Sequence, residues 1–75
     1  MSCENWVTGQ KVITGSAIEI WVDEDGVSVK RMINPGVMGE IVEIRSADHE
    51  MRVRFFNVEK IARLEQDAIH NLLRP

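Results

Sequence analysis

Few side chains in this sequence have a type and spacing that could carry out chemistry. There are two histidines, His49 and His70, and a single cysteine, Cys3. Neither histidine has a second histidine or a cysteine at the spacing of a zinc site, and one cysteine cannot form an internal disulfide. An acid–base pair would also need a cleft, which a domain of 75 residues is too small to form alone. We therefore predict no catalytic residue, no metal site and no cofactor.

The acidic run Asp23-Glu24-Asp25-Gly26 suggests a calcium site at first sight. A calcium-binding loop, however, spaces its oxygen ligands along about a dozen residues and closes with a glutamate. Those ligands are missing from this sequence, and a glycine beside aspartates is typical of a tight turn. We therefore predict a solvated turn.

Trp21 is the residue best suited to bind a partner. It shares one face of the alternating run 17–22 (A-I-E-I-W-V) with Glu19. The opposite face is aliphatic and consists of Ile18, Ile20 and Val22. A partly exposed tryptophan is a typical interface anchor, so we predict that Trp21 and Glu19 contact a partner. The alternative is that residues 1–6 or the end of the chain cover Trp21.

A second group of candidate contact residues lies on the run 51–56. By the same alternation Arg52, Arg54 and Phe56 share the outer face, and we assign them to the partner-binding surface. With Arg45, Lys60 and Arg63 they could form a basic strip that follows a nucleic-acid backbone. We favour the alternative, a solvated face on which these side chains pair with glutamates. The glutamates are Glu43, Glu50, Glu59 and Glu65.

The overall composition narrows the choice of partner. The net charge is −3 and the pI is 5.3, whereas nucleic-acid binders usually carry a basic excess. Another protein chain or a second copy is the expected partner, and nucleic acid is disfavoured. No stretch approaches the about eighteen apolar residues of a membrane span, and there is no signal-peptide pattern. We expect a cytoplasmic protein without membrane contact.

Residues 1–8 are expected to form a loose lead-in, and residues 9–75 a single domain. Turn-forming residues separate short β-prone runs in this domain. The first of these runs span 9–14, 17–22 and 27–33, and Asn34-Pro35-Gly36 is a strong turn signal after the third.

The stretch 36–56 is predicted to form the antiparallel hairpin around which the domain is organised. Burial selects its register, because a slip of one residue exchanges the two faces of a strand. With a four-residue loop at 47–50, the facing pairs are Ile44 with Val53, Val42 with Phe55, and Glu43 with Arg54. A loop at 46–50 would place arginines opposite aliphatic side chains, so we predict the first register.

Residues 58–73 have two interpretations. As a helix they gather an apolar stripe, but Glu65 falls within the stripe and Leu64 lies off it. As strands, a run at 60–65 directs Ala62 and Leu64 inward, a single helical turn follows at 67–70, and a short strand ends the chain at 72–74.

Short strands separated by turns predict a small, partly open five-stranded barrel. In this respect the chain resembles the SH3-like barrels, and most of all the variable (alpha) chain of ferredoxin:thioredoxin reductase. The segments that carry the resemblance are Gly9-Gln10-Lys11-Val12 (similar to G-D-R-V), residues 16–21, residues 35–41 (similar to G-x-x-G-x-V), Val53-Arg54-Phe55 (similar to V-K-F) and residues 62–72. The last segment favours the strand interpretation of the tail. We therefore predict an all-β barrel with a short helical turn near its C-terminal end, and a sheet with a helix over 58–73 as the alternative.

The resemblance implies a non-catalytic scaffold subunit that stabilises a catalytic iron–sulfur partner. The partner would supply the cluster and the redox cysteines. Two features depart from the family: Trp21 is followed by V-D-E-D-G rather than by a histidine and a proline-rich loop, and the hairpin loop is shorter. These departures concern the choice of partner more than the fold.

Two other functions fit a barrel of this size. Type II dihydrofolate reductases are SH3-like barrels whose tetramer builds one active site, and residues 53–56 are similar to their V-Q-I-Y, from which Arg54 and Phe56 depart. KOW-type RNA-binding modules share the G-x-x-G of residues 36–39. Folate-dependent NADPH oxidation would identify the first, and salt-dependent RNA binding the second.

Overall fold

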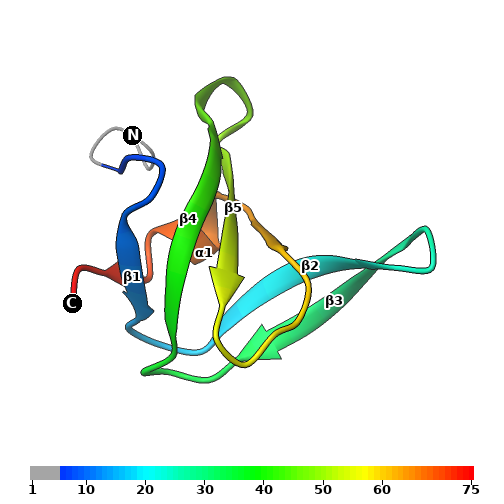
Figure 1. The fold of residues 1–75 in the computed structure, drawn as a ribbon, viewed down its shortest axis with the longest axis horizontal. Coiled ribbons are helices and arrows are strands. Elements are labelled where there is room, and N and C mark those ends of the chain that lie inside the picture. Colours follow the sequence, from blue (N-terminus) through cyan, green and yellow to red (C-terminus); the bar gives the residue numbers. More distant parts are fainter. Residues whose placement is uncertain (1–5) are drawn as a thin grey trace.

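The computed structural model describes residues 6–75, and most of this range forms one curled antiparallel sheet (Figure 1). The strands are β1 (Lys11–Thr14), β2 (Ile18–Glu24), β3 (Val27–Ile33), β4 (Met38–Arg45), β5 (Glu50–Phe55), β6 (Ala62–Leu64) and β7 (Leu72–Leu73). They lie in the order β3-β2-β6-β5-β4-β1-β7. The predicted all-β fold is confirmed, and each β-prone run forms a strand, so the sheet has seven strands where we predicted a barrel of five.

The β2–β3 hairpin is regular and extends away from the body of the molecule, at the right of Figure 1. Its ladder runs without interruption from the pair Ile18–Ile33 to the pair Glu24–Val27. Asp25 and Gly26 form the turn with φ angles of 54° and 80°. A two-residue hairpin turn with positive φ at both positions matches the twist of the strands, and Asp-Gly is a preferred sequence for it. The predicted turn is therefore present at the tip of this hairpin.

The β4–β5 hairpin forms, but its predicted register is wrong. The loop has four residues, 46–49, one position earlier than predicted, and contains a 3-10 turn, η1 (Ser46–Asp48). The observed pairs include Ile44 with Met51, Glu43 with Arg52, Ile41 with Val53, Glu40 with Arg54, and Gly39 with Phe55. The ladder shifts between Ile41 and Glu43, which leaves Val42 as a β-bulge.

The bulge has a physical reason. It reverses the phase of the alternation, so that Gly39 and Ile41 are buried before it while Ile44 packs against the core after it. Gly39 has to be a glycine at this place, because a Cβ atom there would lie 2.8 Å from Val53 Cγ1 and 2.9 Å from Phe55 Cδ1. If β4 had no bulge and Ile44 still faced the core, regular alternation would bury Val42 and expose Ile41.

The strand interpretation of the tail is confirmed, and the helix over 58–73 is wrong. β6 directs Ala62 and Leu64 into the core, as predicted. The helix α1 (Gln66–Ile69) has only four residues, and its buried residues are Ala68 and Ile69. β7 follows and pairs with β1 at the edge of the sheet. Within the described range, no helix has the length and apolar character needed to cross a membrane.

The core fills the concave side of the curled sheet. Its largest fully buried side chains are Val12, Ile20, Ile41, Met51, Val53, Phe55, Leu64 and Ile69. Trp6 packs against this core from the N-terminal side, and the guanidinium carbon of Arg74 lies 4.6 Å from the centre of its ring. The predicted lead-in therefore contributes to the domain from residue 6 onward, and residues 1–5 lie outside the described range.

A buried threonine fixes the turn before β4. Thr14 Oγ1 donates a hydrogen bond to the carbonyl oxygen of Asn34 (2.7 Å) and accepts one from the amide of Val37 (2.9 Å). The amide of Gly36 donates to the carbonyl oxygen of Thr14 at 2.7 Å, and Gly36 has a φ of 82°. These bonds attach the Asn34-Pro35-Gly36 turn to β1, so that β4 starts beside β1.

Candidate functional site

One row of outward-facing side chains crosses five neighbouring strands. We call it the Trp21 row, and it consists of Lys30 (β3), Trp21 (β2), Arg63 (β6), Arg52 (β5) and Glu43 (β4). Each member is the direct cross-strand partner of the next. The row faces outward because the neighbours of its central members along each strand are buried in the core.

Trp21 lies at the point of the row where β2 meets β6. Its side chain is half-buried, as the sequence predicted. The ammonium nitrogen of Lys30 lies 5.3 Å and the guanidinium carbon of Arg63 5.6 Å from the centre of the indole ring. Cation–π contacts at such partly exposed sites contribute about 0.5–1 kcal/mol each. The ring is thus held by cations from the strands on both sides.

The cations of the row have carboxylate neighbours. Lys30 Nζ lies 3.1 Å from Glu19 Oε2, and Arg63 Nη1 lies 3.2 Å from Glu50 Oε2. The predicted pairing of the basic residues with glutamates is therefore confirmed for Glu50, and also for Glu65, whose Oε2 lies 3.9 Å from Arg63. The row itself carries three cations against the single carboxylate of Glu43, and the carboxylates of Glu19, Glu50 and Glu65 beside it offset this excess.

Arg52 and Glu43 are the last two members of the row and form an ion pair. Its Nε atom lies 3.0 Å from Glu43 Oε1, and the same carboxylate contacts Arg45 at 3.3 Å. Arg52 Nε is buried but makes no hydrogen bond of good geometry, so its contact with Glu43 is mainly electrostatic. Glu43 therefore faces Arg52 rather than Arg54, which is a consequence of the corrected register.

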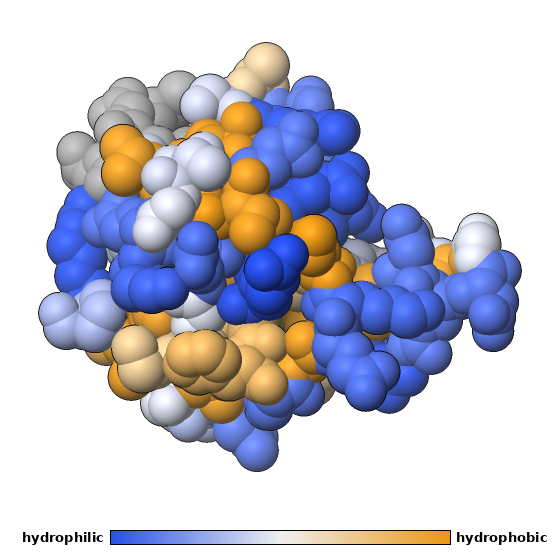
Figure 2. Space-filling view, viewed as in Figure 1, coloured by the Kyte–Doolittle hydropathy of each residue, from blue (hydrophilic) through white to orange (hydrophobic). Residues whose placement is uncertain are grey.

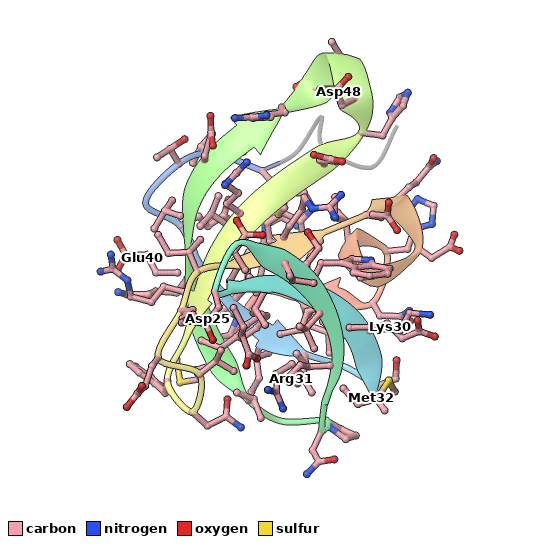
Figure 3. The ribbon with its side chains drawn as sticks, turned by 90° about the vertical axis from the view of Figure 1, so that its right-hand side faces the viewer. Asp25, Lys30, Arg31, Met32, Glu40 and Asp48 are labelled. Atoms are coloured by element: carbon pink, nitrogen blue, oxygen red, sulfur yellow. The ribbon has the colours of Figure 1, made fainter. Side chains whose placement is uncertain are left out.

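A groove with a volume of about 340 Å³ runs beside Trp21, between the β2–β3 hairpin and α1. Its walls include Glu19, Trp21, Lys30 and Met32 from the hairpin and Glu65 and Asp67 from the start of α1. In Figure 3, Lys30 and Met32 extend to the same side of β3, and Arg31 extends to the other. Met32 is 59% exposed, so the groove has an accessible apolar wall.

A second groove, of about 350 Å³, lies between the β2–β3 hairpin and the loop after β5. Its walls include Val22, Arg31, Val58 and Lys60. Arg31 Nε donates a hydrogen bond to Glu24 Oε2 at 2.8 Å, and Lys60 Nζ donates to the carbonyl oxygen of Asp23 at 2.9 Å. Arg31 and Glu24 thus pair within the hairpin, and Lys60 connects the loop after β5 to it.

A shorter outward-facing row lies elsewhere on the same face of the curled sheet and has a different character. We call it the Glu40 row, and it consists of Arg54 (β5), Glu40 (β4) and Lys11 (β1). Lys11 Nζ donates a hydrogen bond of 2.7 Å to Glu40 Oε1. This hydrogen bond, the charge of Lys11 and then the charge of Arg54 lower the pKa of Glu40 below its ordinary value. In Figure 3, Glu40 and Lys30 lie on opposite sides of the molecule.

The structure brings together only some of the residues assigned to the partner-binding surface. Glu19, Trp21 and Arg52 lie in or beside the Trp21 row, whereas Arg54 belongs to the Glu40 row. Phe56 is 79% exposed, but it follows the end of β5, about 13 Å along the strand from Arg52. The predicted outer positions of Arg54 and Phe56 are confirmed, but neither side chain lines the groove beside Trp21.

Sequence reasoning did not assign several contributors to this surface, among them Lys30, Met32, Glu65 and Asp67. The alternation of β3 was a usable signal for the first two, because it directs them to the same side. Asp67 gave no signal, since its position beside Trp21 depends on where the short helix packs.

The histidines and acidic residues do not converge elsewhere. Among residues 6–75, no group of three or more histidine, cysteine, aspartate or glutamate side chains is arranged to hold a metal ion. His49 lies in the β4–β5 loop with a φ of 53°, and His70 follows α1.

Neither a scan against models of known families nor searches of curated proteins and of solved structures gives a significant match to this chain.

Proposed function

We propose that this chain is a protein-interaction or scaffold subunit, without catalysis of its own, that contacts its partner through the Trp21 row. The observation that carries the proposal is the position of Trp21, half-buried in a row that crosses five strands, with a cation on either side of it. Aromatic residues and arginines are enriched among the residues that dominate binding energy at protein interfaces. A rigid sheet also presents them with little entropy left to lose on binding.

The charge pattern supports a protein rather than a nucleic acid as the partner. A phosphate backbone is bound by cations that are free to replace its counterions. In the Trp21 row, Arg52 and Arg63 lie within 3.0–3.2 Å of the carboxylates of Glu43 and Glu50, and the whole chain has a net charge of −3. A surface of mixed charge around an aromatic centre suits a protein surface of complementary pattern.

The sequence resemblance supplies the most specific partner, an iron–sulfur redox chain of the ferredoxin:thioredoxin reductase type. In that case the present chain would stabilise the catalytic chain and would hold no redox group itself. The proposal of a protein partner does not depend on this identification.

Affinity capture from the native cell extract tests the proposal, with wild type, Trp21→Ala and Val27→Ala compared side by side. Val27 is exposed at the tip of the same hairpin and is the matched control. We expect one protein whose recovery falls at least about tenfold with Trp21→Ala and is unchanged with Val27→Ala. An iron–sulfur absorbance in that protein would identify the redox partner.

Circular dichroism and thermal melting of the two variants serve as the control for folding. We expect both to remain folded, because Trp21 is not part of the buried core. A captured protein that binds wild type and Trp21→Ala equally would contradict the proposal, and so would a chain that retains no protein and instead forms a tetramer that oxidises NADPH in the presence of dihydrofolate.

A further inference from the structure

We propose that the groove between the β2–β3 hairpin and α1 binds a basic peptide segment of the partner and places an arginine or lysine side chain against the ring of Trp21. This inference rests on the proposed function and specifies the chemistry of the partner at that site. It is based on the charge, the size and the aromatic wall of the groove.

The groove has more negative than positive groups on its walls. Three carboxylates line it, those of Glu19, Glu65 and Asp67, against one ammonium group, that of Lys30. Arg63 contacts the ring of Trp21, and counting it as well still leaves one carboxylate in excess. A cationic side chain is therefore the complementary occupant.

The ring of Trp21 is already a binding place for cations. Two cations of the chain itself, on Lys30 and Arg63, lie within 5.3–5.6 Å of the centre of the ring. Apart from the contact with the ring itself, Lys30 is held there by its pair with Glu19, and both side chains are more than half exposed (54% and 57%). Exposed ion pairs contribute little, about 0–1 kcal/mol, so an incoming cation can displace Lys30 from the ring at small cost.

The groove has the size of a side-chain site. Its volume of about 340 Å³ is at the lower end of the range of ligand pockets, about 300–1,000 Å³. This volume fits one or two side chains of an extended segment rather than the surface of a folded domain. The exposed side chain of Met32 offers apolar contact for the methylene groups of an arginine or lysine.

The carboxylates of the groove lie on two facing walls. Glu19, Trp21 and Lys30 stand on the rigid sheet, whereas Glu65 and Asp67 stand at the start of α1 on the facing wall. A guanidinium that stacks on the ring therefore has carboxylates within reach on both walls. Arginine is the more favourable occupant of the two, because its planar group can stack and donate to a carboxylate at the same time.

The test uses the full chain with Trp6→Phe, which leaves Trp21 as the only tryptophan and therefore as a fluorescent reporter of the groove. The probe is an acetylated and amidated peptide, Gly-Ser-Arg-Gly-Ser-Arg-Gly-Ser. Matched peptides carry citrulline, which has the shape of arginine without its charge, or glutamate in place of arginine. We expect the arginine peptide to change the fluorescence of Trp21 and to bind about fivefold or more tightly than the citrulline peptide. The glutamate peptide should not bind.

Nuclear magnetic resonance on the unmodified chain provides a second readout that does not depend on the Trp6→Phe variant. The arginine peptide should shift the indole N–H signal of Trp21 and the amide signals of residues 65–68. Shifts confined to other residues would overturn the proposal, and so would equal binding of the citrulline peptide. Dimerisation of the chain that blocks the groove would overturn it too, by making a second copy the occupant.

A charge-matched pair of double variants separates binding in this groove from the effect of the overall charge of the chain. Glu65→Gln with Asp67→Asn should weaken binding of the arginine peptide about threefold to tenfold. Asp48→Asn with Glu59→Gln removes the same charge at exposed positions that do not line the groove, and should leave binding unchanged. Equal losses in the two double variants would show only non-specific attraction and would overturn the proposal.

The same variants distinguish the proposal of a basic peptide in the groove from the proposal of an interaction subunit. If capture of the native partner depends on Trp21 but not on Glu65 and Asp67, the groove proposal fails and the interaction subunit remains. If capture depends on none of the three residues, both proposals fail.

Discussion

The two hairpins of this molecule have the same connectivity but differ in how much of each is buried. The β4–β5 hairpin lies at the centre of the sheet, is interrupted by a bulge at Val42, and contributes Ile41, Met51, Val53 and Phe55 to the core. The β2–β3 hairpin lies at the edge, has an unbroken ladder, and extends into solvent with a largely hydrophilic surface (Figure 2).

The difference shows where irregularity is useful in a small sheet. The central hairpin has to bury side chains on both sides of a bend, and the bulge allows Ile41 and Ile44 to face the same interior. The edge hairpin buries only one face of β2, so that regular alternation is sufficient and leaves Trp21 and Glu19 outside. Stability should therefore be concentrated in the first hairpin, and the candidate contact surface in the second.

The largest effect should come from two adjacent phenylalanines at the end of β5. Phe55 is 1% exposed and Phe56 is 79% exposed. We expect Phe55→Ala to lower the free energy of unfolding by about 3–5 kcal/mol, because it leaves a cavity in the core. Phe56→Ala should change it by less than about 0.5 kcal/mol. Urea unfolding followed by circular dichroism measures both changes. Similar losses in the free energy of unfolding for the two variants would contradict this prediction.

An intermediate effect should come from Gly39, beside the bulge. In Gly39→Ala the new Cβ atom would meet the side chains of Val53 and Phe55 at 2.8–2.9 Å and the carbonyl oxygen of Arg54 at 3.0 Å. We expect a loss of about 1–3 kcal/mol in the free energy of unfolding from this overpacking. Ser28→Ala on the edge hairpin is the control, since it removes only a long, exposed hydrogen bond to Asp23. An unchanged urea midpoint for Gly39→Ala would show that the backbone can yield here.

The smallest effect should be electrostatic and should lie in the Glu40 row. Because the pKa of Glu40 is lower in the folded than in the unfolded state, its contribution to stability is present above the unfolded pKa and is lost as the pH falls through the folded pKa. Lys11→Met removes the hydrogen bond and should raise the pKa of Glu40 in a carbon-detected titration. Lys30→Met, on the opposite side of the molecule, should leave that pKa unchanged, and an equal shift would assign the effect to net charge.

The edge hairpin could be predicted from the sequence pattern, the strands of the tail only through the family resemblance, and the central register could not be predicted. The alternation of Ile18, Ile20 and Val22 and the Asp-Gly turn are local signals, and both strands of this hairpin follow them. In β4 the pattern is ambiguous, because Ile41 and Val42 are adjacent and either can face inward. Pairing of Ile41 with Val53 on the next strand decides between them, and such a pairing is not encoded locally.

The candidate surface follows the same division. The sequence could predict that Trp21 and Glu19 share an outer face, because this depends only on alternation along one strand. It could not predict that Arg63 and Arg52 continue the row, since that depends on how β6 joins β2 to β5. Phe56 was assigned to the same surface from an extrapolated alternation, but it lies beyond the end of β5.

The pairing of β1 with β7 has a consequence for how the molecule is made. β1 is synthesised before the other six strands of the sheet, but two of its residues, Ile13 and Thr14, pair with Leu73 and Leu72 of β7. Until β7 has been synthesised, the far edge of β1 stays open to strands of other chains. Such long-range pairing is also slow to form. Nascent chains that stall before residue 72 should therefore depend on chaperones more than the finished chain does.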